Sequence, residues 1–369
     1  MSEAIANRLR VSVMARAETE QEGLRDGDDN TLWESAWSLV ASINSRLLES
    51  GPSPDPALLD IDMHDLWHRY WHGAINTSPG NPKLDRLALS IIQIREQGVL
   101  IRDSATHGSS KGSPTAREQN PEDEMPLAMT SNGARIWTDL PFLVEDMTAH
   151  WTHSRATLSS AQRLSAAQFL AHIAAAGAVE DDALCGIALV VLRHTLETPR
   201  QLGRLTATER NQDRRSQDLT VADLLPSANA WLFTTGRKLV QLSDDEWNES
   251  PADVGALGEL VVDGARHDDP SEDVPAHGGF SPQRWMWWLR RLEEIGTLAE
   301  RDDRAKEIGE GERSLLTFVR GVMDNMMLIA EQTNGAVARM VQAGGGVGYR
   351  PVMQMVGSDR PPGTHLGSE

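Results

Sequence analysis

Three histidines with helical spacing are the first residues that could do chemistry. His64, His68 and His72 stand four residues apart, so a helix would place them along one face. Two imidazoles at this spacing can share a divalent metal ion, and His150, His153 or a carboxylate would complete the site. The first histidine is not followed by the glutamate of a metalloprotease helix. A solvated or hydrogen-bonded histidine face is therefore favoured, and we assign no metal and no cofactor.

Paired aspartates are the second candidate. On a helix that faces an apolar cavity, such pairs could hold Mg²⁺ and a diphosphate, as in terpene cyclases. None of the pairs is followed by the Asn/Ser/Glu triplet that those cyclases use. Two pairs stand where helices are predicted to begin, and the helix dipole favours acids there. A structural role is therefore favoured for Asp181-Asp182, Asp244-Asp245, Asp268-Asp269 and Asp302-Asp303.

Arginine and tryptophan alternate in one segment near residue 285. Arg284, Arg290 and Arg291 share a predicted helix with three tryptophans. An anion pocket with indole walls would need these residue types, and tryptophan is also common at protein interaction sites. A core helix with inward indoles and ion-paired arginines is the favoured alternative. The candidate ligand-binding residues here and in an earlier Trp-Thr-Asp segment are Arg284, Trp285, Trp288, Arg291, Trp137 and Asp139.

The same segment contains the sharpest local signal for a helix. Ser281 suits an N-cap, and Pro282 suits the first helical position. Trp285 and Trp288 are three residues apart, so they share a face that we expect to be buried. Trp287 is expected to point elsewhere.

Other common chemistries find no support in the sequence. Cys185 is the only cysteine, which excludes an internal disulfide, and its apolar neighbours predict a small buried side chain. The glycine-rich stretch 344–348 lacks the Lys-Ser/Thr pair of a phosphate loop. No Ser-His-Asp set with an elbow motif occurs. We therefore assign no catalytic residue.

The charge balance limits the partners. The 369 residues contain 35 Lys and Arg against 54 Asp and Glu, a net charge of −19. This field repels phosphate, so we expect neither nucleic acid nor an anionic membrane as a partner. The N-terminus has no apolar signal region, and the apolar run around Cys185 is about half the length that crosses a bilayer. We expect a cytoplasmic or nuclear protein that binds an unknown protein or small molecule.

Helical periodicity is present in every apolar segment, and alternating strand patterns are hard to find. Asn81 and Pro82 predict another helix start. The predicted helices span about 31–48, 61–74, 82–97, 144–151, 164–176, 181–197, 220–239, 253–265, 282–300 and 304–332.

These elements predict the fold class and its boundaries. We expect an all-α protein, a single compact irregular bundle of about eight to ten helices with long polar loops. Residues 1–29 form a polar N-terminal arm, and residues 30–340 form the helical domain. A flexible insertion is predicted at about 103–126, and a disordered tail at 341–369, because neither can bury enough apolar surface.

Four stretches in this order resemble a fungal family known as a domain of unknown function, number 3632. They are Leu66-Trp67-His68-Arg69-Tyr70 with 82–87, Trp137-Thr138-Asp139-Leu140-Pro141 with Trp151, 166–196, and 279–292. The resemblance implies a helical intracellular protein. It implies no reaction, so no catalytic residue is transferred from it.

Two classes of function fit these observations. The first is a non-enzymatic helical module that binds a protein or small molecule through a Trp-lined surface. The second is an enzyme of fungal secondary metabolism that acts in an apolar, Trp-lined cavity between helices. An enzyme should bring titratable groups together in a closed pocket, and a binding module should expose tryptophan on one face. The first class is favoured because no catalytic constellation stands out.

Overall fold

The computed structural model describes residues 3–25, 29–48, 55–100, 128–268, 278–305 and 314–344. The protein is 72% helical, and within these ranges the sole strand-like pairing is an isolated bridge between Met129 and Arg135. The all-α prediction is therefore confirmed. The insertion predicted at 103–126 lies outside the described residues, and so does the tail beyond residue 344.

The described ranges contain thirteen α-helices, more than the eight to ten expected. They are α1 Glu3–Arg25, α2 Asp29–Leu48, α3 Pro56–Asn76, α4 Lys83–Arg95, α5 Leu143–Ser154, α6 Ser160–Ala175, α7 Cys185–Leu192, α8 Val221–Asp244, α9 Ala252–Gly255, α10 Glu259–Asp268, α11 Pro282–Ala305, α12 Leu315–Glu331 and α13 Ala336–Gly344. Short 3₁₀ turns span Glu180–Asp182 and Ser216–Asp218, and a π-helical turn spans Arg193–Glu197.

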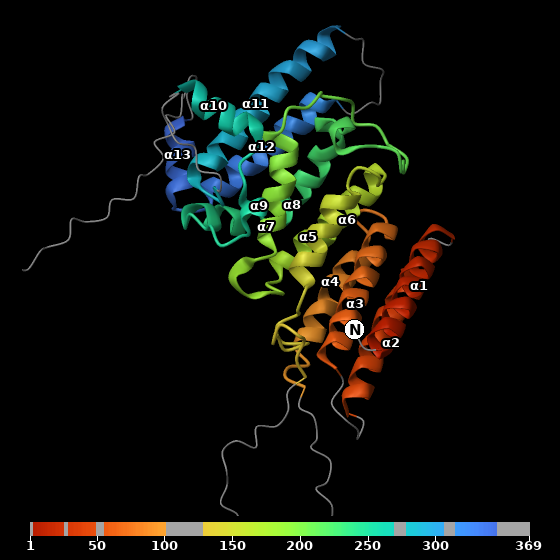
Figure 1. Ribbon diagram of the computed structural model, residues 1–369. Coiled ribbons are helices and arrows are strands. Elements are labelled where there is room, and N and C mark those ends of the chain that lie inside the picture. The colour runs from red at the N-terminus through yellow and green to blue at the C-terminus, as the bar shows by residue number, and fades with distance from the viewer. Residues whose placement is uncertain are drawn as a thin grey trace, which may run out of the picture.

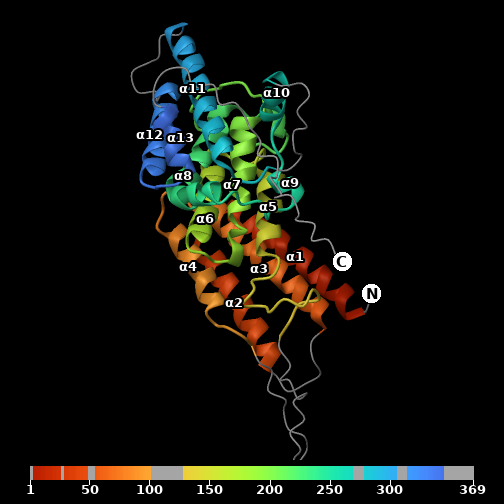
Figure 2. The same ribbon diagram turned by 90° about the vertical axis from the view of Figure 1, so that its left-hand side faces the viewer.

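The helices form one elongated bundle (Figures 1 and 2). Helices α1 to α4 occupy one end, and α10 to α13 occupy the other. Helix α6 lies between them and packs against α3 and α4 on one side and α8 on another. One large apolar cluster runs from α2 to α13 and forms the core of the bundle, and a small second cluster comprises Ala156, Leu219 and Leu224. Every residue of α7 is buried, as its uninterrupted apolar sequence predicted.

The predicted polar arm forms α1, which packs along α3. Its basic side chains meet acids that α3 buries. Arg8 Nε donates to Asp62 Oδ1 at 2.8 Å, and Asp62 also pairs with Arg46 of α2. Arg16 Nε donates to Asp65 Oδ1 at 2.6 Å. Both carboxylates are buried, so α1 packs on α3 largely through polar side chains. This explains why the sequence of α1 shows little apolar periodicity.

Several predicted helix starts are confirmed by their caps. The Ser281 hydroxyl accepts the Arg284 backbone N–H at 3.1 Å at the start of α11. Thr220 caps α8 through a reciprocal capping box with Asp223. Asn81 Oδ1 accepts the Lys83 N–H at 3.0 Å, although α4 begins after Pro82.

Two aspartate pairs lie differently from the sequence prediction. Asp181 has φ 55°, so 180–182 forms a turn rather than the start of a long helix. Asp244 ends α8 instead of beginning a helix. Its Oδ1 accepts the Val337 N–H at 2.7 Å and thereby caps α13. The Asp244 carboxylate thus satisfies one of the protein's own N–H groups, as the structural interpretation expected.

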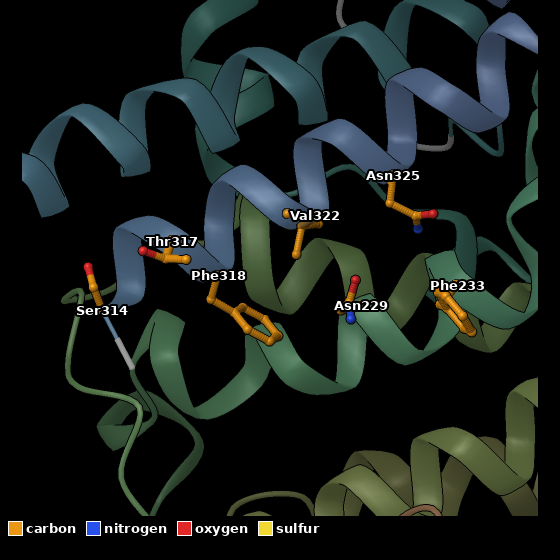
Figure 3. Close-up of a pocket in the computed structure, with 8 residues that line it drawn as sticks. Asn229, Phe233, Ser314, Thr317, Phe318, Val322 and Asn325 are labelled. Atoms are coloured by element: carbon orange, nitrogen blue, oxygen red, sulfur yellow. The ribbon is translucent and has the colours of Figure 1, made fainter. Parts of the chain in front are cut away.

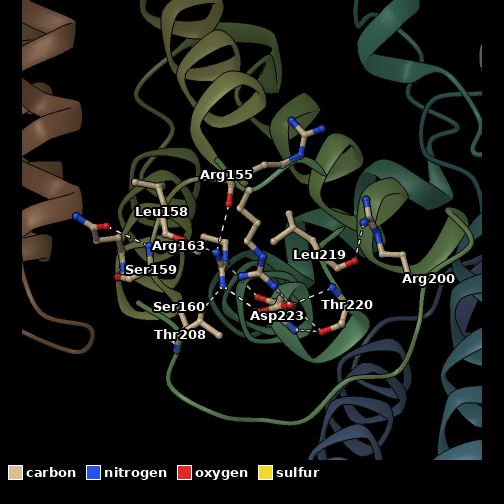
Figure 4. A network of polar contacts seen from close by, with 12 residues as sticks. Arg155, Leu158, Ser159, Ser160, Arg163, Arg200, Thr208, Leu219, Thr220 and Asp223 are labelled. Atoms are coloured by element: carbon tan, nitrogen blue, oxygen red, sulfur yellow. Dashed lines mark hydrogen bonds and ion pairs between the residues drawn. The ribbon is translucent and has the colours of Figure 1, made fainter. Parts of the chain in front are cut away.

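A network of arginines holds the irregular segment 198–220 (Figure 4). Arg163 is fully buried, and its guanidinium donates to Leu158 O, Thr208 Oγ1 and Asp223 Oδ1. Arg200 donates to the carbonyls of Ser216 and Leu219, each at 2.8 Å. These bonds replace the backbone ladders that the loop lacks. Burial lowers the pKa of Arg163 to about 10, which leaves it charged at neutral pH.

Candidate functional site

The predicted arginine–tryptophan segment forms a buried cluster around Glu197. This carboxylate is fully buried at the end of the π-helical turn. Its Oε1 accepts Arg284 Nε and Trp288 Nε1, both at 2.7 Å. Its Oε2 accepts a second Arg284 nitrogen at 2.9 Å and the Gly258 N–H at 2.7 Å. Four N–H groups from three residues therefore surround one buried charge.

Arg284 has no donor left for a ligand. Besides the two bonds to Glu197, its guanidinium donates to Gly279 O at 2.7 Å, Ala256 O at 3.1 Å and Gly255 O at 3.2 Å. All five N–H donors of an arginine are thus used by the protein. These bonds also explain why the predicted helix 253–265 is interrupted between α9 and α10, since the carbonyls there turn toward Arg284.

The tryptophans of α11 are interior. Trp285 and Trp288 are fully buried, as expected, and their rings meet edge to face at 6.2 Å. Trp287 is also buried, with 6% of its surface exposed, so the expectation that it points away from the core was wrong. The reason is that α11 is covered on several sides, by α8, α12 and α13. Every tryptophan whose side chain the structure describes is buried or half-buried.

The other predicted ligand-binding residues do not join this cluster. Arg291 pairs with Glu294 on the same helix at 2.9 Å. Trp137 Nε1 donates to Asn44 Oδ1 at 2.9 Å, beside α2 at the other end of the bundle. The Asp139 carboxylate pairs with Arg135 at 2.6 Å, and this hydrogen bond lowers the pKa of Asp139. The geometry favours core packing for the three tryptophans and ion pairing within the protein for Arg284, Arg291 and Asp139, over a shared ligand pocket.

Sequence reasoning missed Glu197, which organises the cluster. One signal was available, because Glu197 is a single acid that closely follows a long apolar run. Buried acids are rare unless paired, so that position indicated a buried partner. The partner itself lies 87 residues away, and only the tertiary structure shows which arginine it is.

A surface pocket lies between α8 and α12 (Figure 3), and we call it the α8–α12 pocket. Its volume is about 680 Å³, within the range typical of small-molecule sites. The residues that line it are Asn229, Phe233, Ser314, Thr317, Phe318, Gly321, Val322 and Asn325. None of these side chains carries a charge. Phe233 is 76% exposed, which is unusual for an aromatic ring in a protein with a large core.

One hydrogen-bond donor beside this pocket has no partner among the described residues. Asn325 Nδ2 is buried and has no hydrogen-bond partner among the described residues. Figure 3 shows the Asn325 side chain directed from α12 toward α8. An unpaired buried N–H donor costs about 1–3 kcal/mol, and a ligand acceptor that reaches Asn325 Nδ2 would remove this cost.

A second pocket of about 350 Å³ adjoins the first and shares Asn229, Phe233 and Phe318 with it. Its far wall is formed by α4 and α6. There the His172 Nδ1 lies 2.6 Å from Asp85 Oδ1, with both side chains partly exposed. Among the residues that line the two pockets, this pair supplies the titratable groups.

The predicted histidine face divides into two parts. His64 is partly exposed and pairs with Asp146 at 2.8 Å. His68 and His72 are buried, and their ring centroids lie 4.4 Å apart. Burial lowers the pKa of His68 to about 4 and that of His72 to about 3. His150 stacks on Trp71 at 5.4 Å and lies beside this pair.

Comparison with known proteins assigns the chain to a family. The model of the family described as "Protein of unknown function (DUF3632)" matches residues 67–292. The chain belongs to this family. A curated relative from Penicillium oxalicum, named "Oxopyrrolidines biosynthesis cluster protein G", is 32% identical over 295 residues, which cover 79% of this chain and 74% of the relative. No solved structure matches the chain.

The DUF3632 match covers some features of this protein and omits others. It includes Glu197, Arg284 and Trp288, so the buried cluster belongs to the matched region. It ends before α12, which supplies one wall of the α8–α12 pocket, and begins after α1. Within the described part of the chain, every helix is too short or too polar to span a membrane.

Proposed function

We propose that this DUF3632 protein binds a small, uncharged, partly apolar molecule in the α8–α12 pocket as part of a pathway of secondary metabolism. The observation that carries the proposal is the buried, unpartnered Nδ2 of Asn325, beside a pocket of about 680 Å³ without charged walls. A charged ligand would lose its hydration there and find no counter-charge, so a neutral ligand is favoured.

The side chains of the pocket indicate the chemistry of the ligand. Phe233 and Phe318 provide aromatic surface, and Asn229 and Asn325 provide amides that can donate and accept hydrogen bonds. A lactam with an aromatic substituent would match both. The relative's printed name associates that protein with oxopyrrolidine biosynthesis, and an oxopyrrolidine is a five-membered lactam. We therefore extend the proposal to ligands of this class.

Filling the pocket tests the proposal without disturbing the core. Gly321 lines the pocket, and a Cβ added there meets nothing within 4 Å. Gly321→Leu should therefore fold normally while its side chain occupies the space of the ligand. The probe is 5-benzyl-2-pyrrolidinone, and isothermal titration calorimetry measures its affinity. We expect the substitution to weaken binding at least about tenfold, which corresponds to about 1.4 kcal/mol.

The matched control is Gly264→Leu. Gly264 lies on α10, is also free of neighbours at its Cβ position, and does not line this pocket. The affinity of the Gly264→Leu variant for the probe should equal that of the wild type. A carboxylate-bearing analogue of the probe should bind more weakly than the neutral compound. Equal binding by Gly321→Leu and wild type would exclude the α8–α12 pocket as the site.

An enzymatic role in the same pathway is the second candidate, and the His172–Asp85 pair supports it. A carboxylate that contacts an imidazole can orient it as a general base, and this pair borders the neighbouring pocket. Mass spectrometry of the probe after incubation with the protein separates the two roles. Binding alone leaves its mass unchanged, whereas a conversion that disappears in His172→Ala would favour the enzyme.

A further inference from the structure

Three potential metal ligands meet where α1 lies along α3. Glu20 of α1 and His68 and His72 of α3 each present a ligand atom within 4.8 Å of the other two. His68 Nε2 lies 3.9 Å from Glu20 Oε1, which is too far for a hydrogen bond. Elsewhere in the described ranges, no set of three histidine, cysteine or acidic residues comes this close together.

Neighbouring ion pairs set the register of the two helices at this point. Arg8, Ser12, Arg16 and Glu20 stand four residues apart along one side of α1. Arg8 pairs with Asp62, whereas Ser12 and Arg16 both donate to Asp65 at 2.6 Å. The next position of this row, Glu20, therefore reaches the next turn of α3, where His68 stands. Arg16 pairs with Asp65, and this carboxylate offsets part of the positive charge of Arg16 near His68.

One ring nitrogen of the buried His68 is left without a hydrogen-bond partner within the described ranges. The His68 side chain is 8% exposed, and its Nε2 has no hydrogen-bond partner in the described part of the chain. A buried imidazole nitrogen without a partner is unfavourable, so it indicates a group that the protein chain does not supply. Glu20 is 56% exposed, which leaves its carboxylate free to move toward the two rings.

We propose that Glu20, His68 and His72 bind one divalent transition-metal ion of the Zn²⁺ class. Imidazole nitrogens with one carboxylate suit such ions, whereas Mg²⁺ and Ca²⁺ prefer oxygen ligands. Bonds of about 2.1 Å in tetrahedral geometry place ligand atoms about 3.4 Å apart. The ligand atoms lie within 4.8 Å of one another, so a contraction of at most about 1.4 Å brings the set to this spacing. Three protein ligands leave a fourth position for water or a small ligand.

Direct metal binding by the full-length, untagged protein tests this proposal. After removal of metal with a chelator, Zn²⁺ is titrated in competition with a chromophoric chelator, and Co²⁺ absorption reports the coordination geometry. We expect one Zn²⁺ per chain and no comparable binding of Mg²⁺. Zn²⁺ should also raise the thermal midpoint, because the ion would link α1 to α3.

Single substitutions assign the ligands. Glu20→Gln, His68→Ala and His72→Ala should each weaken Zn²⁺ binding at least about tenfold, since loss of even an outer-shell partner costs about 10–100-fold. Glu20→Gln is the decisive variant because this exposed side chain contributes nothing to the core. Its thermal midpoint should match the wild type without metal and no longer respond to Zn²⁺.

Matched controls are available on the same helix and beside it. Glu18→Gln changes another exposed acid of α1, and His153→Ala removes an exposed histidine of α5. Both should bind Zn²⁺ like the wild type. The proposal is overturned if the wild type takes up no Zn²⁺, or if the control variants lose as much affinity as the ligand variants.

Discussion

Replacing Glu197 with alanine is expected to lower the free energy of unfolding by about 3–5 kcal/mol. The substitution leaves the buried Arg284 guanidinium without its counter-charge and removes the acceptor of Trp288 Nε1 and Gly258 N. A buried charge that loses its partner is far more costly than the intact pair is stabilising. The loss is a large fraction of the roughly 5–15 kcal/mol typical of a folded protein. Urea denaturation followed by circular dichroism measures it.

A matched control and a rescue separate the charge effect from general damage. Glu294→Ala removes an acid that pairs with Arg291 at the surface of α11, and it should change stability by less than about 0.5 kcal/mol. The double substitution Glu197→Leu with Arg284→Met replaces the ion pair with apolar side chains. It should recover much of the stability that either single change removes. A Glu197→Ala protein as stable as the wild type would show that the cluster is not a structural element.

Truncating the α11 tryptophans should be nearly as harmful. Trp285→Ala, Trp287→Ala and Trp288→Ala should each cost about 3–5 kcal/mol, because each removes a large buried side chain and leaves a cavity. Trp288→Ala should lie at the upper end, since it also deletes a hydrogen bond to Glu197. Thermal and urea unfolding of the three variants measures these losses.

Phe233→Ala is the comparison for the tryptophan series. Phe233 is 76% exposed, so its removal should change stability by less than about 0.5 kcal/mol while weakening binding of the pyrrolidinone probe. The opposite result for the tryptophan variants would show that these residues bind a ligand or partner instead of forming the core. If Trp285→Ala and Trp288→Ala left stability unchanged but abolished binding of a ligand or partner, these indoles would form a recognition surface.

Local sequence determined much of the helical architecture. The Ser281 cap is formed within one helical turn, so residue type and spacing were sufficient to predict it. The start of α8 near Thr220 was also predicted, and the structure adds its capping box. The continuous apolar run of α7 likewise predicted a central helix. Predictions failed where distant groups compete for the backbone. The segment 253–265 has helical periodicity throughout, yet its carbonyls at the junction of α9 and α10 accept hydrogen bonds from Arg193 and Arg284, and the helix is divided there.

Which residues make up the candidate sites depended on tertiary structure, for a different reason. The sequence indicated that His68 and His72 share a face, because helical spacing is local information. It did not indicate Glu20, since the contact requires the register that Arg8 and Arg16 set on the buried acids of α3. Likewise, Phe233 ends an apolar stretch, and its exposure follows from where α12 packs on α8. Periodicity determines which side chains share a helix face, but only the packing of distant helices decides which face is covered and which remains available to a ligand.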